Sequence, residues 1–124
     1  MIRTMAAVLA AGLATVALAG TAAAAPASAT KCGSTYCLAV KGSGLHVDTA
    51  TVYLKSGKAA TGYFYLEVST GSGATFLWSP KETDVLSVRW SDLTFSGTVS
   101  LCGGVAPTKS NVDHPGDGCV SVHA

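Results

Sequence analysis

Apolar and polar residues alternate with a period of two through most of the chain after residue 30, as in β-strands with one buried face. The pattern is clearest over residues 93–101, LTFSGTVSL, where hydroxyl side chains fill the polar face. The apolar face carries Leu93, Phe95, Val99 and Leu101. We predict a single half-buried strand here, with Gly97 marking a bulge or a close neighbour.

Six further segments follow the same rule. They are residues 36–40, 49–54, 63–68, 74–78, 84–90 and 119–123. In residues 63–68 the pattern directs Phe64 inward and both Tyr63 and Tyr65 outward. In residues 84–90 it directs Leu86, Val88 and Trp90 inward and Arg89 outward. We expect residues 36–40 to open the domain.

The alternation changes phase near Asp48. Val47 and Ala50 have opposite parity although both are apolar, which indicates a β-bulge or two separate strands. His46 and Asp48 share a face only in a regular strand. Because the phase changes here, we do not expect them to form a zinc-binding pair.

Turn-forming Gly, Ser and Pro residues separate these segments at spacings of roughly ten to fifteen residues. No segment after residue 30 has a helical period. Many short strands at such spacing predict an all-β sandwich or barrel. We expect about seven strands in two sheets, immunoglobulin-like in architecture.

The first 29 residues have the layout of a secretory signal peptide. Arg3 precedes a small, apolar stretch over residues 6–20, and small residues follow it. We expect cleavage before Thr30, which leaves 95 of 124 residues (124 − 29) as one domain, residues 30–124. The Ala-rich leader is typical of exported proteins of high-GC Gram-positive bacteria. The mature protein is therefore expected outside the cell, free or associated with the cell wall.

Four cysteines follow this leader: Cys32, Cys37, Cys102 and Cys119. An even number of cysteines in a small exported domain indicates disulfides, and three pairings are possible. We favour Cys32–Cys37 and Cys102–Cys119, because each closes a local loop. A crossed pairing that ties the first strand to the last remains open. The spacings do not fit a zinc site.

Charge excludes several classes of function. The chain has eight Lys and Arg residues and seven Asp and Glu residues, and removal of Arg3 leaves seven of each. A net charge of zero does not favour binding to nucleic acid, and the chain has no run of Lys or Arg residues that would bind a membrane surface.

The motifs of nucleophilic catalysis are also absent from the sequence. The chain lacks a Gly-x-Ser-x-Gly motif and has no cysteine left as a thiolate. We therefore expect a monomeric protein that is not an enzyme and needs no cofactor.

Residues 103–118 form a long predicted loop between two cysteines. A disulfide at its ends would preorganise it for binding. Its Lys109–Ser110 bond suits a trypsin-like protease, as in an inhibitor's reactive segment. Its Asn111, Asp113 and Asp117 are hard oxygen ligands suited to calcium, but these residue types are also common in turns. We predict no metal site.

The outward tyrosines form a second candidate surface. Tyr63 and Tyr65 offer two rings that suit a sugar or a protein partner. If their strand neighbours that of Arg89, the guanidinium would lie over a phenol ring. Alternatively, the tyrosines are cross-strand pairs that stabilise the sheet.

These features together predict a small secreted, non-enzymatic binding protein with a protein or polysaccharide partner outside the cell. The candidate surfaces are the loop 103–118 and the Tyr63/Tyr65 face. A protease inhibitor that acts through Lys109–Ser110 is the first alternative. A carbohydrate-binding module that uses Tyr63 and Tyr65 is the second.

Overall fold

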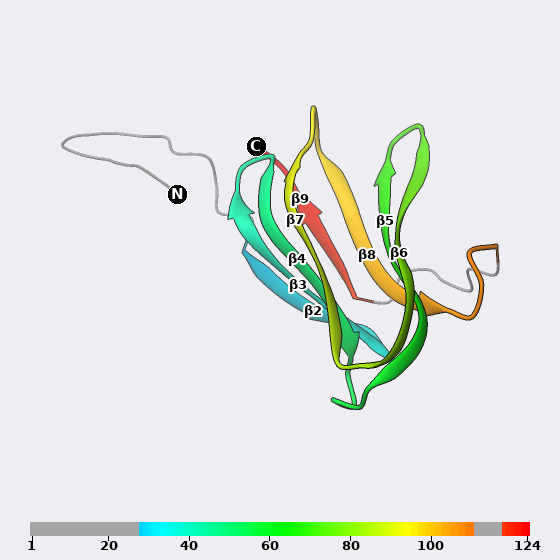
Figure 1. Ribbon diagram of the computed structural model, residues 1–124. Coiled ribbons are helices and arrows are strands. Elements are labelled where there is room, and N and C mark those ends of the chain that lie inside the picture. The colour runs from blue at the N-terminus through cyan, green and yellow to red at the C-terminus, as the bar shows by residue number, and fades with distance from the viewer. Residues whose placement is uncertain (1–27, 111–117) are drawn as a thin grey trace.

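The computed structural model describes residues 28–110 and 118–124, which fold into strands without a helix. The strands are β2 (Ala29–Cys32), β3 (Tyr36–Ser43), β4 (His46–Leu54), β5 (Ala60–Thr70), β6 (Gly73–Val85), β7 (Ser87–Thr94), β8 (Val99–Ala106) and β9 (Cys119–Val122). They form two antiparallel four-stranded sheets in the orders β2-β3-β4-β7 and β6-β5-β8-β9 (Figure 1). The all-β prediction is confirmed, with eight described strands where about seven were expected. The described part of the chain offers no helix able to span a lipid bilayer.

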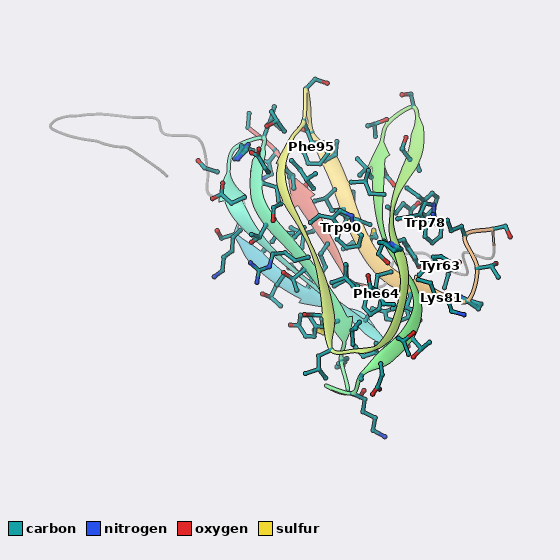
Figure 2. The ribbon with its side chains drawn as sticks, viewed as in Figure 1. Tyr63, Phe64, Trp78, Lys81, Trp90 and Phe95 are labelled. Carbon is teal, nitrogen blue, oxygen red and sulfur yellow. A yellow bond between two sulfur atoms is a disulfide. The ribbon has the colours of Figure 1, made fainter. Side chains whose placement is uncertain are left out.

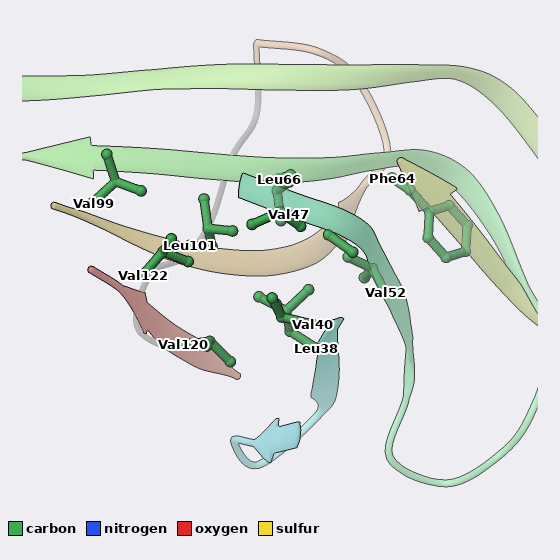
Figure 3. Close-up of a cluster of buried hydrophobic side chains, with 11 residues drawn as sticks. Leu38, Val40, Val47, Val52, Phe64, Leu66, Val99, Leu101, Val120 and Val122 are labelled. Atoms are coloured by element: carbon green, nitrogen blue, oxygen red, sulfur yellow. The ribbon is translucent and has the colours of Figure 1, made fainter. Parts of the chain in front are cut away.

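One apolar core lies between the two sheets. Its buried members from the first sheet are Leu38, Val40, Val47, Ala50 and Val52, and those from the second sheet are Phe64, Leu66, Val99, Leu101, Val120 and Val122. Figure 3 shows side chains of both groups projecting into a shared interior. Within β3, β5, β8 and β9 these are alternate residues, so the period-two pattern of the sequence is the direct cause of this packing.

Tight turns set the register of two hairpins. Ser43 pairs with His46 across a two-residue turn in which Gly44 has φ 59°, a left-handed value that glycine adopts without strain. Thr70 pairs with Gly73 across the turn that joins β5 to β6. These turns fix which side chains of the paired strands share a face.

The phase change at Asp48 is a β-bulge within one continuous strand. The pairing of β4 with β3 shifts between Lys41 and Gly42, which leaves Asp48 as the extra residue. On the neighbouring strand Asp92 has φ 59°, a left-handed conformation that an aspartate tolerates better than most residues. Val47 and Ala50 therefore both reach the core despite their opposite parity.

The single strand predicted over residues 93–101 is wrong. β7 ends at Thr94 in the first sheet and β8 begins at Val99 in the second, with a bend at Ser96–Gly97 between them. The alternation continues across this bend because both sheets direct their apolar side chains into the same core. Gly97 is exposed in the bend and marks neither a bulge nor a close neighbour, since a Cβ there would meet nothing within 4 Å.

Two smaller expectations also fail. Residues 36–40 do not open the domain, because β2 precedes them and pairs with β3. Leu86 does not point inward: it lies in the one-residue bend between β6 and β7 and is 65% exposed. The bend carries the chain from one sheet to the other, and a side chain at that position has no interior to enter.

Both favoured disulfides are confirmed. Cys32 lies directly opposite Cys37 on neighbouring strands, and Cys102 lies directly opposite Cys119. Each bond therefore joins two strands of the same sheet. Two disulfides in a small all-β domain fit an extracellular protein.

The loop predicted over residues 103–118 begins later than expected. β8 continues to Ala106, and Gly103 and Gly104 pair within the sheet. Both glycines permit close approach of bulky neighbours. A Cβ at Gly103 would lie 2.6 Å from a Val52 methyl group on the opposite sheet. Glycines that indicated a loop in the sequence are thus packing positions in a strand.

The predicted leader lies mainly outside the described residues. Ala29 pairs with Val40 as the first residue of β2, and its side chain packs against the core. Cleavage before Thr30 would therefore remove the first residue of this strand and keep the other three.

Candidate functional site

Aromatic side chains gather on the outer face of the β6-β5-β8-β9 sheet, away from the core. Phe64 and Leu66 face the core, so the alternate residues of β5 face outward. The rings on this outer side, which we call the aromatic face, are those of Tyr63, Tyr65, Phe76 and Trp78. Figure 2 shows Tyr63 and Trp78 together with Lys81 on the side of β5 and β6 away from β7.

Three of these rings form a cluster. The Phe76 and Trp78 rings are stacked at 21° with centroids 5.7 Å apart. The Tyr65 ring lies edge-on to Phe76 at 5.6 Å and tilted to Trp78 at 5.5 Å. Aromatic pairs in such geometries contribute about 0.5–1.5 kcal/mol each beyond the area they bury. Phe76 and Trp78 remain partly exposed, so the cluster has a solvent-facing side.

Tyr65 points outward as predicted, but it is not exposed. Only 2% of its surface is accessible, because Phe76 and Trp78 flank the ring and its far side lies directly over Gly104. A Cβ at Gly104 would lie 2.5 Å from the Tyr65 Cζ atom. Tyr65 therefore forms the floor of the cluster, and its neighbours on β6 provide the surface that a partner can reach.

Tyr63 contacts the segment that follows β8. The Nζ atom of Lys109 lies over the Tyr63 ring at 5.5 Å from its centroid, a cation–π contact. Lys109 and Ser110 are both exposed, as an inhibitor would require, but the lysine side chain folds back onto the domain. Thr108 and Ser110 share a hydrogen bond between their hydroxyl groups at 3.3 Å.

Glu67 borders the aromatic face beside Phe76 and Cys102, the residues directly opposite it on the neighbouring strands. The Ser69 hydroxyl donates to its Oε2 atom at 3.5 Å. Its Oε1 atom is buried and has no hydrogen-bond partner within the described residues. Buried carboxylate oxygens in folded proteins are normally paired, so this acceptor is an unusual feature of the face.

Arg89 does not join the aromatic face. It lies on β7 in the other sheet, opposite Thr51, and is exposed. The condition under which Arg89 would lie over a phenol ring is not met, because β7 pairs with β4 and β5 pairs with β6 and β8. Alternation assigns a residue to a face, but it does not assign a strand to a sheet.

A histidine cluster occupies the outer face of the first sheet. The His46 Nε2 atom lies 3.2 Å from Asp48 Oδ1 and 3.4 Å from Asp92 Oδ1, and its Nδ1 atom is 2.8 Å from the Thr94 hydroxyl. The bulge therefore brings His46 and Asp48 together, where the sequence indicated separation. The histidine side chain is 41% exposed and the carboxylates 68% and 87%, so water competes for every contact. This open cluster links the bulge of β4 to the neighbouring strand β7.

Asn111, Asp113 and Asp117, the alternative calcium ligands, lie outside the described residues. Within the described residues no group of three or more His, Cys, Asp or Glu side chains is arranged to hold a metal ion.

Alternation alone did not identify Phe76 and Trp78 as surface residues. The available signal was the Gly71–Ser72 turn: a two-residue turn places Tyr65 opposite Trp78 and Glu67 opposite Phe76, so each pair shares a face. The parity of Trp78 is ambiguous in the sequence because residues 76–78 are all apolar and do not alternate.

The fold and site together define a disulfide-tied β-sandwich with an aromatic outer face. No protein-family model matches the chain, and neither a curated protein nor a solved structure is significantly similar to it.

Proposed function

We propose that this protein is a secreted, non-enzymatic binding domain that engages an extracellular partner through the aromatic face. The observation that carries the proposal is the position of the Tyr65–Phe76–Trp78 cluster on the outer side of the sheet. A domain of this size gains most stability by placing such rings in its core. Partly exposed rings on a rigid strand suit partner recognition instead, because few rotamers are lost on binding.

Two features around the cluster support this proposal. Tyr65 is held between its neighbours and Gly104, so the rings are ordered before any partner arrives. Lys81 lies opposite Tyr63, and Lys109 lies over its ring, which places two cations at one border of the face. A central apolar patch with a polar rim is the usual anatomy of a binding surface.

The test is capture of partners from the producer's culture medium, and retention on insoluble polysaccharides, by the purified disulfide-intact protein. Trp78→Ala should weaken binding by about tenfold or more, because truncated aromatic anchors commonly cost 2 kcal/mol or more. The matched control is Tyr53→Ala, which removes a partly exposed ring from the outer face of the other sheet. Equal binding by both variants and the wild type would exclude the aromatic face.

The protease inhibitor is the second candidate, favoured by one observation: Lys109 and Ser110 are exposed shortly after the end of β8. Against it, the lysine side chain lies over Tyr63 and would have to leave this contact to enter a protease pocket. An inhibitor would slow trypsin at near-stoichiometric ratios. Lys109→Ala would abolish this effect, whereas Lys109→Arg would preserve it.

The immunoglobulin-like form is also part of the proposal. If the strands are lettered A to H backward along the chain, so that β9 is A and β2 is H, the sheet β9-β8-β5-β6 has the order A-B-E-D. The sheet β7-β4-β3-β2 then has the order C-F-G-H. Immunoglobulin domains have the orders A-B-E-D and C-F-G in the forward chain direction. The arrangement of strands in space therefore supports immunoglobulin-like architecture with the chain direction reversed. An experimental structure would test this order.

A further inference from the structure

We propose that the protein forms a two-fold dimer through the edge of β6, in place of the monomer expected from its sequence. β6 is the outermost strand of its sheet, and among the described strands it pairs only with β5. An unpaired edge presents a row of backbone donors and acceptors that a second strand can satisfy. This inference is independent of the proposed binding function.

The two halves of β6 differ in how they are protected against pairing. The second half carries Pro80 and Lys81, a register shift beside them, and Asp84 at φ 54°. Proline, lysine and irregular backbone are the devices by which natural sheets prevent edge-to-edge association. Their concentration in this half leaves the first half, residues 73–79, as the open edge.

Residues 73–79, GATFLWS, have no such protection. No charged residue occurs between Glu67 and Lys81, and no proline occurs between Glu67 and Pro80. The segment pairs with β5 in unbroken register from Gly73 to Trp78. Uncharged stretches of six or seven residues with aromatic and β-branched side chains have a strong tendency to pair as strands.

The other edge strands, β2, β9 and β7, are less suited to pairing with a second chain. β2 and β9 have four residues each, and a disulfide fixes one end of each. β7 is longer, but it carries Arg89 and the left-handed Asp92. The first half of β6 is therefore the only uncharged, regular edge of this length among the described strands.

The sequence of this edge is complementary to itself. If Leu77 lies opposite the partner's Leu77 in an antiparallel pair, Phe76 lies opposite the partner's Trp78, and the same contact repeats across the two-fold axis. The intrachain Phe76–Trp78 stack would thereby continue across the junction. This complementarity favours a second copy of the chain over an unrelated strand.

Sedimentation velocity of the purified disulfide-intact protein over a range of concentrations tests the proposal. We expect a concentration-dependent dimer. Thr75→Lys, at an exposed position of the edge, should weaken dimerisation by about tenfold or more, because a lysine on an edge strand opposes pairing with a second strand and the two-fold axis brings two new charges to one junction. Ser121→Lys adds the same charge on the edge strand β9, at an exposed position, and should leave the dimer unchanged.

Amide hydrogen exchange gives a second measurement. Amides within residues 74–78 should become more protected as the wild-type protein dimerises, and Thr75→Lys should remove this gain. A wild-type protein that remains monomeric at millimolar concentration would overturn the proposal. So would a dimer that both lysine variants affect equally.

Discussion

Gly104→Ala is the substitution that tests most directly how the aromatic face is built. The Cβ atom of an alanine would lie 2.5 Å from Tyr65 Cζ and 2.8 Å from Cε2, closer than nonbonded carbons approach. The ring must then leave the sheet surface. Overpacking of this kind costs about 1–3 kcal/mol. Alanine recovers roughly 0.5–1 kcal/mol over glycine within a strand, so the net loss of unfolding free energy should be about 1–2 kcal/mol.

A double-mutant cycle with Tyr65→Ala separates this steric effect from other consequences of the substitution. Once the ring is absent, Gly104→Ala should be neutral or stabilise the protein by up to about 1 kcal/mol. Urea denaturation of the four proteins, with disulfides intact, measures the coupling. Gly97→Ala is the control: its Cβ would meet nothing within 4 Å, and it should change stability by less than about 0.5 kcal/mol. An equal cost of Gly104→Ala in both backgrounds would refute the role assigned to Tyr65.

Three further predictions concern contacts between the two sheets and the disulfides within each sheet. Gly103→Ala should destabilise the protein by about 1–3 kcal/mol in urea, because the new methyl would overlap Val52 on the opposite sheet. Tyr36→Phe should cost about 0.5–1.5 kcal/mol in the same assay, because the Tyr36 hydroxyl donates to the Val105 carbonyl of the other sheet at 3.2 Å. Reduction of both disulfides should lower the free energy of unfolding by about 5 kcal/mol, as chain entropy predicts for loops of these lengths, and a shift below 1 kcal/mol would contradict that account.

The sequence predicted local features of the fold well, because they depend on neighbouring residues. Alternation identified Phe64 and Leu66 as core residues, and the phase change at Asp48 proved to be a bulge. The short loops between cysteines indicated both disulfides. Each of these inferences needs only the parity or spacing of residues within one segment.

Features that depend on which strands meet were less predictable. The alternation of residues 93–101 is the same whether the chain stays in one sheet or crosses to the other, so it could not reveal the bend at Gly97. Arg89 has the outward parity that was predicted, but its strand belongs to the sheet without the tyrosines. Gly104 indicated a loop because its role, support for a ring, appears only once β5 and β8 are paired.

The placement of the disulfides has a mechanical consequence. Each disulfide joins two strands of one sheet, and among the described residues no disulfide connects one sheet to the other. A tensile load that separates β2 from β3, or β8 from β9, must rupture a sulfur–sulfur bond. A load that pulls the two sheets apart breaks only dispersion forces and polar contacts before the backbone segments that connect the sheets become taut. Under force we therefore expect the molecule to yield at the plane between its sheets.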